Sequence, residues 1–254
     1  KLSRSCLYTR RVCVFAPKRP KTLDNSETSA VQIRVAYPRN AGEVATAAGW
    51  YLRPSVRDKE AYVGKAPVVK LAAPMGSYLA IVRKKGYRDV RCPVSVGRNA
   101  DVAQSVKLYR EEEIGEGFVY VPGGPFISGG DPTLRMEPKV REVGDFAIGR
   151  YPVTCAEYLE FINDVGSRDR EEARKHAPRW QDVGGFHWIE GDDGVWRLPE
   201  GKDAYKLVWT PDQPVVEVNW FDANAYCAWR SEREGRKVEL PSEWAWEKAA
   251  RGVD

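Results

Sequence analysis

The stretch 214–254 carries the pattern that most constrains the fold of this chain. It begins with the β-branched valine run at 215–218, which predicts a short strand. Asn219 or Asp222 can cap the helix that follows, and we expect Gly235 to end it. The order strand, helix, turn, helix therefore indicates a chain that mixes helices and strands.

Both helices of this stretch show apolar residues at helical spacing. The first presents Phe221, Ala225, Ala228 and Trp229 along one face, which we expect to be the buried face. Ser242 can cap the second helix, and Glu243 lies near the positive end of its dipole. The second helix then contains Trp244, Trp246, Ala249 and Ala250.

The residues PVVEVNWFDANAYCAW, followed by ELPSEWAWEKAARG, resemble the central signature of the sulfatase-modifying-factor family, which includes the formylglycine-generating enzymes. The chain departs from the pattern where Asn219 replaces Ser, Glu239 replaces Arg, Ser242 replaces Thr and Ala245 replaces an acidic residue. The Trp, Asp-Ala, Tyr-Cys and Leu-Pro positions stay in register. The resemblance implies a C-type-lectin-like fold that is poor in regular secondary structure.

The charge of the chain is divided unevenly along its length. Residues 1–109 hold 21 Lys and Arg against 7 Asp and Glu, whereas residues 110–254 hold 19 against 29. This break predicts a domain boundary near residue 110. It also permits attraction between the halves or binding of an acidic partner, but we prefer a chance spread of solvated basic side chains to a role in nucleic-acid binding.

The basic half divides into a linker and a β domain. Residues 1–28 are basic and hold Pro17 and Pro20, so we expect a linker there. Residues 29–110 should form a small β-sandwich, because short β-branched runs alternate with turn residues. The expected strands are Val31–Val35, Trp50–Val56, Val68–Leu71, Tyr78–Arg83, Asp89–Val96 and Val102–Tyr109.

Part of this β domain resembles the PEGA type of surface domain. The resemblance rests on Met75-Gly76-Ser77-Tyr78-Leu79-Ala80-Ile81 and on Lys85-Gly86-Tyr87-Arg88. We expect Gly86 to take a positive φ in a turn, and Tyr78 and Tyr87 to pack across the sheet.

Residues 111–254 form the second predicted domain, which we interpret as a sulfatase-modifying-factor domain truncated at its C-terminus. The strands at 118–121 and 126–128 should be joined by a turn as the family's opening hairpin, and residues 143–154 resemble the family's next strand. Thr154 and Glu157 make a capping box for a helix that runs to about residue 165. The charged residues 168–175 indicate a short solvated helix.

The segment between Gly166 and Pro214, which we call the insertion, is rich in aromatic residues and turn formers. The resemblance implies that it contributes to a substrate-facing surface, so its side chains are candidates for contact with a peptide or ligand. Packing is the interpretation we prefer, because large rings fill the interior of a fold with little regular structure. The residues are Trp180, Phe186, His187, Trp188, Trp196, Tyr205 and Trp209.

The cysteines do not indicate a disulfide framework or a zinc site, because they are odd in number, widely spaced and accompanied by two histidines only. We expect Cys227 to be a reduced core residue, since the position of its family disulfide partner is Ala250. Cys155 lies in a helical first turn but replaces a common Asn, so we interpret it as incidental. The five are Cys6, Cys13, Cys92, Cys155 and Cys227.

The family's chemistry is expected outside this sequence. The resemblance implies a copper-binding cysteine pair and calcium sites that would lie beyond Asp254, so the chain is expected to be a fragment without catalytic, cofactor-binding or metal-binding residues of its own. No segment of 1–254 has the length and apolarity of a signal peptide or a membrane span. The few, widely spaced cysteines predict a reducing compartment, and the resemblance to bacterial relatives implies the cytoplasm of a bacterium.

Three functions remain open at this point. The first is oxidation of a client-protein cysteine to formylglycine, with a client protein or peptide as the partner. The second is a non-catalytic recognition or sensor module of a bacterial serine/threonine kinase, with the kinase domain on the same polypeptide. The third, a sulfoxide-synthase relative, is the weakest because the N-terminal half is β-like and contains no cluster of histidines. Neither nucleic acid nor membrane is an expected partner.

Overall fold

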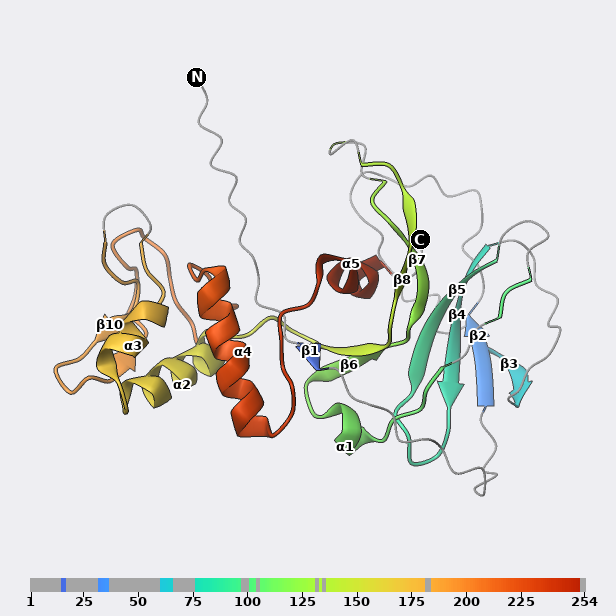
Figure 1. The fold of residues 1–254 in the computed structure, drawn as a ribbon, viewed down its shortest axis with the longest axis horizontal. Helices are drawn as coiled ribbons and strands as arrows, with labels where there is room; N and C mark the ends of the chain where they lie inside the picture. The colour runs from blue at the N-terminus through green and yellow to red at the C-terminus, as the bar shows by residue number, and fades with distance from the viewer. Residues whose placement is uncertain are drawn as a thin grey trace. The chain divides into compact units, whose positions relative to one another are not determined.

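The computed structural model divides into two compact units, which are described separately. The helical unit comprises Lys1–Ala16 and Ile148–Pro241, and the sheet unit comprises Pro17–Ala147 and Ser242–Asp254. Helices and strands are mixed along the chain, as expected (Figure 1). The residues described are 15–16, 32–36, 60–65, 76–96, 101–103, 106–130, 133, 136–180 and 184–251.

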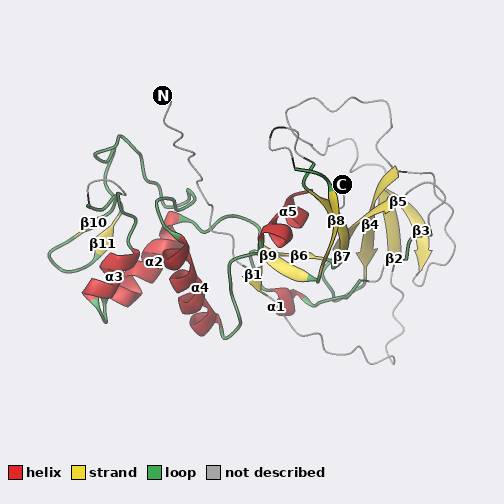
Figure 2. Cartoon of the chain, turned by 45° about the horizontal axis from the view of Figure 1, so that its top comes forward, coloured by secondary structure: helices red, strands yellow, loops and turns green. Residues whose placement is uncertain are grey.

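The sheet unit contains a four-stranded antiparallel sheet in the order β3-β2-β4-β5, drawn in yellow in Figure 2. Its strands are β2 (Gln32–Ala36), β3 (Glu60–Lys65), β4 (Gly76–Arg83) and β5 (Val90–Val96). Three of the predicted strands are thus confirmed, whereas β3 was not predicted. Gly86 has a φ of 82° in the turn before β5, as the sequence indicates.

A sandwich needs a second sheet facing this one. The strands predicted at 50–56 and 68–71 lie outside the described residues. The sandwich, and the domain boundaries at 28/29 and 110/111, therefore stay predictions.

The strand predicted at 102–109 is wrong. The described residues there, 101–103 and 106–109, form no strand. The reason lies in Asp145, whose carboxylate accepts hydrogen bonds from Lys107 Nζ at 2.9 Å and from Tyr109 Oη at 2.7 Å. Residues 107–109 are thus held by side-chain hydrogen bonds to Asp145 rather than by the backbone hydrogen bonds of a strand.

The next elements of the chain form a helical turn and two small sheets. One sheet has the strand order β1-β9-β6, and β7 and β8 pair as an antiparallel hairpin. The elements are β1 (Phe15–Ala16), α1 (Glu111–Ile114), β6 (Phe118–Val121), β7 (Gly124–Ser128), β8 (Lys139–Val143) and β9 (Phe146–Gly149).

The expected hairpin between β6 and β7 is a second error. Both strands exist, but β6 pairs with β9 and β7 pairs with β8. The connection at Gly123 passes so close to the β8–β9 turn that a Cβ atom there would lie 2.8 Å from the backbone nitrogen of Asp145. This close approach directs the two strands into different sheets.

Helix α5 (Glu243–Arg251) packs on the β7–β8 hairpin within the sheet unit. The Ser242 hydroxyl accepts from the backbone N–H of Ala245 at 3.1 Å, which confirms the predicted cap. Lys248 is 5% exposed and donates to the carbonyl of Gly124. Trp246 of α5 is 50% exposed, whereas the Trp244 ring lies under the guanidinium of Arg141 in β8, 4.5 Å from the ring centroid. This helix therefore docks through the buried Ala245, through Lys248 and through this cation–π contact.

In its described residues, the helical unit contains three helices and a two-stranded ribbon. The Thr154–Glu157 capping box is present as predicted, with the Thr154 hydroxyl accepting from the Glu157 N–H at 3.2 Å. The elements are α2 (Cys155–Gly166), α3 (Arg170–His176), β10 (Ile189–Glu190), β11 (Trp196–Arg197) and α4 (Trp220–Glu234).

Helix α4 begins after Asn219 and ends at Gly235, whose φ of 62° gives the left-handed C-terminal cap. Its predicted buried face is wrong, because Phe221 is 71% exposed while Tyr226 is 1% exposed. Tyr226 stacks on Tyr158 of α2 with ring centroids 5.6 Å apart, and this contact sets the rotation of the helix. The buried residues of α4 are Asp222, Ala223, Tyr226 and Cys227.

The valine run before α4 is not a strand. Val215 is buried and donates its backbone N–H to the carbonyl of Val153 at 2.9 Å, and the Cys155 N–H donates to the carbonyl of Gln213 at 2.9 Å. These bonds make one isolated antiparallel bridge between Thr154 and Pro214, and no strand is present at 215–218. Glu217 has a φ of 58°, a left-handed conformation that interrupts the extended chain. Periodicity alone does not reveal such a bend.

Replacing Asn219 by Ala should lower the free energy of unfolding of the helical unit by about 1 kcal/mol. The Asn219 side chain accepts from the N–H groups of Phe221 and Asp222 at 2.8 and 3.0 Å, and Ala leaves both without an acceptor. Urea denaturation followed by circular dichroism measures the change. The Asn219→Ser variant is the control and should lose much less, so equal losses in the two variants would contradict the capping role.

Candidate functional site

The part of the insertion that follows α3 is held together by buried rings. Trp188, Trp196 and Trp209 are 2%, 1% and 4% exposed. The Phe186 ring packs edge-on against Trp196 at 4.9 Å, and Trp188 packs edge-on against Trp209 at 6.0 Å. The preferred interpretation of these aromatic residues as packing residues is therefore confirmed for the three tryptophans.

Asp203 is the polar centre of the insertion. Its side chain is 4% exposed. It accepts from His187 Nδ1 at 2.7 Å, from Trp209 Nε1 at 2.9 Å, and from the backbone N–H groups of Tyr205 and Leu207. Burial raises the pKa of Asp203, but these donors outweigh it and lower the pKa to about 2.

The hydrogen bonds of His187 fix its tautomer. Nδ1 lies 2.7 Å from the Asp203 carboxylate and 3.1 Å from the indole nitrogen of Trp180. Because the ionised carboxylate can only accept, Nδ1 must carry a proton and donate to Asp203. The indole N–H of Trp180 then faces another donor, so this contact contributes no hydrogen bond.

A second buried carboxylate, Asp222, joins α3 to α4. Its side chain is 3% exposed and accepts from Arg179 Nη2 at 2.8 Å and from the backbone N–H of Asn219 at 2.9 Å. His176 Nδ1 lies 3.1 Å away. Burial raises the pKa of Asp222, but these three partners outweigh it and lower the pKa.

His176 lies between two carboxylates. Asp222 raises the pKa of His176 through its hydrogen bond and its charge, burial opposes this, and Glu172 at 3.3 Å from Nε2 raises it further. The carbonyl of His176 also accepts from Tyr158 Oη at 2.9 Å. His176 is therefore held by contacts from three helices: Tyr158 of α2, Glu172 of its own helix α3, and Asp222 of α4.

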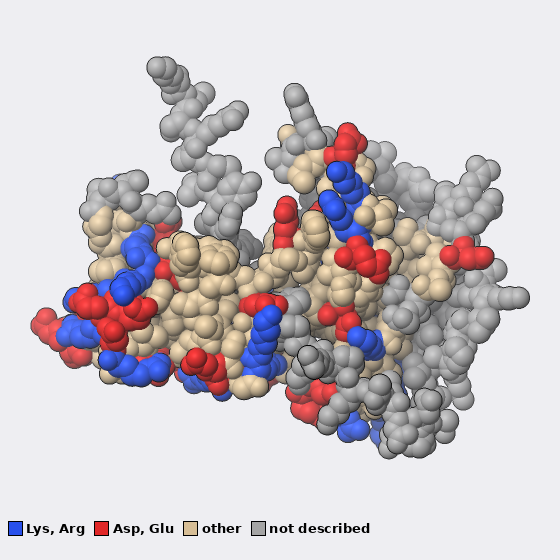
Figure 3. All heavy atoms as spheres, viewed as in Figure 1, with Lys and Arg blue, Asp and Glu red and all other residues tan. Residues whose placement is uncertain are grey.

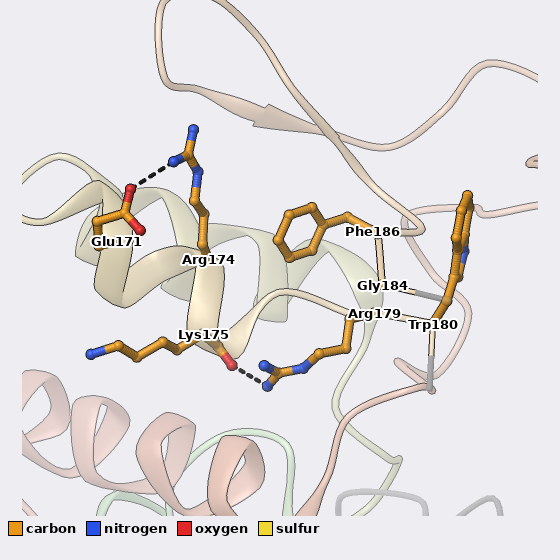
Figure 4. Close-up of a pocket in the computed structure, with 8 residues that line it drawn as sticks. Glu171, Arg174, Lys175, Arg179, Trp180, Gly184 and Phe186 are labelled. Carbon is orange, nitrogen blue, oxygen red and sulfur yellow. Dashed lines mark hydrogen bonds and ion pairs between the residues drawn. The ribbon is translucent and has the colours of Figure 1, made fainter. Parts of the chain in front are cut away.

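A pocket of about 260 Å³ opens between α3 and the part of the insertion that follows it, residues 179–186. Figure 4 shows the ring of Phe186 pointing toward α3, with Arg174 and Lys175 on the helix side. Over this part of the face drawn in Figure 3, acidic and basic side chains are interspersed. The lining residues are Glu171, Arg174, Lys175, Arg179, Trp180, Gly184, Gly185 and Phe186.

Exposed apolar side chains lie on the same segment as Asp203. Tyr205, Leu207 and Val208, which we call the insertion patch, are 51%, 40% and 51% exposed. The Tyr205 ring packs edge-on against Trp180 of the pocket with centroids 5.1 Å apart. Pocket and patch are thus joined by one aromatic contact, and together they offer cations and apolar surface to a ligand.

The three cysteines in the described part of the chain are poorly suited to redox chemistry. Cys92, Cys155 and Cys227 are buried and free. Burial raises their pKa values to about 11, 11 and 12, so their thiols stay protonated at neutral pH. Cys6 and Cys13 lie outside the described residues.

The described residues do not fit the metals that the resemblance implies. Within them, no group of three or more His, Cys, Asp and Glu side chains is placed to hold a metal ion. The protonated thiols are also the wrong form for a copper ligand. Copper and calcium sites in a longer polypeptide remain predictions.

Sequence reasoning missed the polar residues of this site. It considered Asp222 only as a cap, and it gave no role to Arg179 or Asp203. Two local signals were present. Asp222 is three residues after the cap Asn219, a spacing at which its side chain can accept from the Asn219 N–H. Asp203 begins a turn, in which its side chain can accept from the backbone N–H of Tyr205 two residues later. Asp203 also contacts His187, 16 residues away, and Asp222 also contacts His176, 46 residues away, and no local sequence pattern predicts contacts between residues so far apart.

Comparison with known proteins identifies a family whose model matches part of this chain. Residues 104–254 match the sulfatase-modifying factor enzyme 1-like domain. An inactive C-alpha-formylglycine-generating enzyme 2 of Bos taurus is 36% identical over 167 residues, 55% of this chain and 52% of the relative. A formylglycine-generating enzyme of Thermomonospora curvata is 32% identical over 164 residues, 56% of this chain and 50% of the relative.

A relative with another name also matches. A hercynine oxygenase of Mycolicibacterium smegmatis is 34% identical over 153 residues, 52% of this chain and 30% of the relative. The chain thus spans about half the length, or less, of the curated relatives it matches.

The helical unit should lose stability as the pH rises through the folded-state pKa of His176. That pKa is raised above its ordinary value of 6.5, so the stabilisation is fully present below 6.5 and is lost above the folded pKa. Urea denaturation over a pH series, with an NMR titration of His176, measures this. In the His176→Gln control this component of the pH dependence should vanish, and an NMR pKa below 6.5 would contradict the assignment.

Replacing Cys227 by Ala should lower the free energy of unfolding by roughly 1–2 kcal/mol without creating a chemical defect. The Cys227 side chain is buried on α4, and its loss leaves a small void. Denaturation measures the loss, and mass spectrometry after alkylation should find the native thiol unmodified. Rapid alkylation of Cys227 in the folded protein would contradict a purely structural role.

Proposed function

This chain belongs to the sulfatase-modifying factor enzyme 1-like family, and from that membership we propose that it holds a client polypeptide for a formylglycine-generating type of protein. In this proposal residues 1–254 recognise the client, and the oxidation of the client cysteine is carried out by a part of the protein outside them. Copper at the cysteine pair that the resemblance implies would supply that oxidising chemistry.

The insertion patch is the observation that carries the proposal. Tyr205, Leu207 and Val208 expose apolar side chains on a segment that Asp203 fixes through four hydrogen bonds. A fixed apolar surface binds at a lower entropic cost than a mobile one. The buried, protonated cysteines argue in the same direction, because they favour recognition over catalysis by this part of the chain.

The names of the relatives agree with a division between recognition and chemistry. Formylglycine-generating enzymes, a hercynine oxygenase and a protein named inactive all match over about the same share of this chain. A segment shared by such proteins fits a scaffold with a binding surface better than a determinant of one reaction.

Several finer predictions stay proposals. The C-type-lectin-like fold and a cytoplasmic location rest on the resemblance and on the free cysteines.

No helix among the described residues has the length and apolar character needed to cross a membrane. The PEGA-like domain and the association with a bacterial signalling kinase gain no support from the comparisons, so client recognition is the alternative we carry forward.

Peptide selection against the 1–254 chain tests the proposal. Peptides selected from a random displayed library should bind the chain, and a Leu207→Ser, Val208→Ser double variant should bind them about tenfold more weakly because apolar burial is lost. Ile189→Ser is the matched control, since Ile189 is 53% exposed in β10 but lies outside the patch. Isothermal titration calorimetry measures the affinities.

The same peptides also separate recognition from catalysis. When they contain cysteine, the 1–254 chain should leave the thiol intact, as judged by mass spectrometry and an aldehyde-reactive probe. Equal binding by the double variant and the control would overturn the role of the patch. Aldehyde formation by residues 1–254 would overturn the division of recognition from chemistry.

A further inference from the structure

The insertion patch lies on a tight turn of the chain. Lys202 and Val208 form an antiparallel bridge, and inside it the Asp203 N–H donates to the carbonyl of Leu207 at 2.9 Å. The Lys206 N–H donates back to the carbonyl of Asp203 at 2.9 Å, so the loop between the two bridge residues is compact. Because the two residues of an antiparallel bridge place their side chains on the same face, Lys202 lies beside Val208 of the patch.

Lys206 occupies this turn in a strained backbone conformation. Its φ is 63°, in the left-handed region that residues with a Cβ atom rarely adopt. The left-handed position of a short hairpin loop is usually filled by glycine, which adopts it without strain. This chain has a lysine there, between Tyr205 and Leu207 of the patch, so the turn exposes a cation although its backbone is strained.

The two lysines of the turn are exposed and are not ion-paired. Among the residues that the structure describes, neither Lys202 nor Lys206 forms an ion pair. The acid of the turn, Asp203, is 4% exposed, and its carboxylate is already used by His187 and by donors of the insertion. Two exposed acids, at positions 200 and 212, flank the turn in the sequence, and neither forms an ion pair with a described residue. The patch therefore presents apolar side chains together with two cations that have no described counter-ion.

We propose that the polypeptide segment received by the insertion patch carries acidic side chains next to its apolar residues, and that Lys202 and Lys206 bind these carboxylates. This inference rests on the proposed function, since it specifies the client that the same patch holds. Opposite charges beside an apolar contact speed association and reject partners of the wrong charge, while apolar burial supplies the larger part of the affinity. A client with Lys or Arg at these positions is disfavoured, because it meets two like charges.

The strain at Lys206 separates binding from stability. The Lys206→Gly variant should unfold at a higher urea concentration than the native chain, because glycine adopts the left-handed conformation freely. The same variant should bind acidic peptides roughly threefold more weakly, because one charge is lost. Weaker binding by a more stable variant is not a consequence of misfolding. A Lys206→Gly variant less stable than the native chain would contradict the strain.

The peptides selected on the 1–254 chain are the probes for the acidic preference. Compared with the unselected library, their sequences should be enriched in Asp and Glu next to apolar residues. Synthetic versions in which an acid is replaced by Gln should bind roughly threefold more weakly per acid in isothermal titration calorimetry, and this difference should shrink as salt is added. Versions with Lys in place of the acids should bind more weakly than the Gln versions.

A double-mutant cycle connects the acids of the peptide to the lysines of the chain. Lys202→Gln and Lys206→Gln remove the charges but keep a polar side chain. Each should weaken the acidic peptides roughly threefold and leave the affinity of the Gln peptides unchanged. Lys237→Gln is the matched control and should change neither affinity, since Lys237 is 64% exposed and lies outside the turn.

Each outcome decides the inference. Enrichment of acids, with loss of the acid preference in both glutamine variants, supports it. Peptides that bind through Leu207 and Val208 without an acid preference overturn it and leave the proposed function intact, as does an acid preference that survives in both variants. If no peptide binds, the proposed function fails and the inference fails with it. Thermal unfolding confirms that each variant is folded.

Discussion

The helical unit depends on one buried carboxylate. Asp222 completes the N-terminal cap of α4 through the Asn219 N–H, and the same carboxylate receives His176 and Arg179 from the end of α3. Removing it from water is costly, and only this full set of partners offsets the cost. Helix start, helix packing and the position of the pocket arginine are therefore set together and cannot vary separately.

Local features of the sequence predicted local structure well. The caps at Thr154, Asn219 and Ser242 and the glycine at 235 are all in the expected places, because a cap involves residues within a few positions of each other. The short β-branched runs at 78–83 and 89–96, separated by turn residues, likewise predicted β4 and β5. Each of these signals is complete within a short window.

Features that depend on distant residues were not predictable. The rotation of α4 follows from the stacking of Tyr226 on Tyr158, and the valine run bends because Val215 pairs with Val153 and Glu217 then turns. At the candidate site, the aromatic content was visible but the carboxylates that organise it were not. A buried Asp looks like any surface Asp until its partners are known.

Five tryptophans in the described part of the chain fall into two optical groups. The indole nitrogens of Trp188 and Trp196 are buried without a hydrogen-bond partner, whereas Trp220, Trp244 and Trp246 are 56%, 44% and 50% exposed. An indole in a dry, apolar site emits at shorter wavelength than one in contact with water. The intrinsic fluorescence is therefore a composite spectrum whose blue edge reports the interior of the insertion, while its red edge reports the surfaces of α4 and α5.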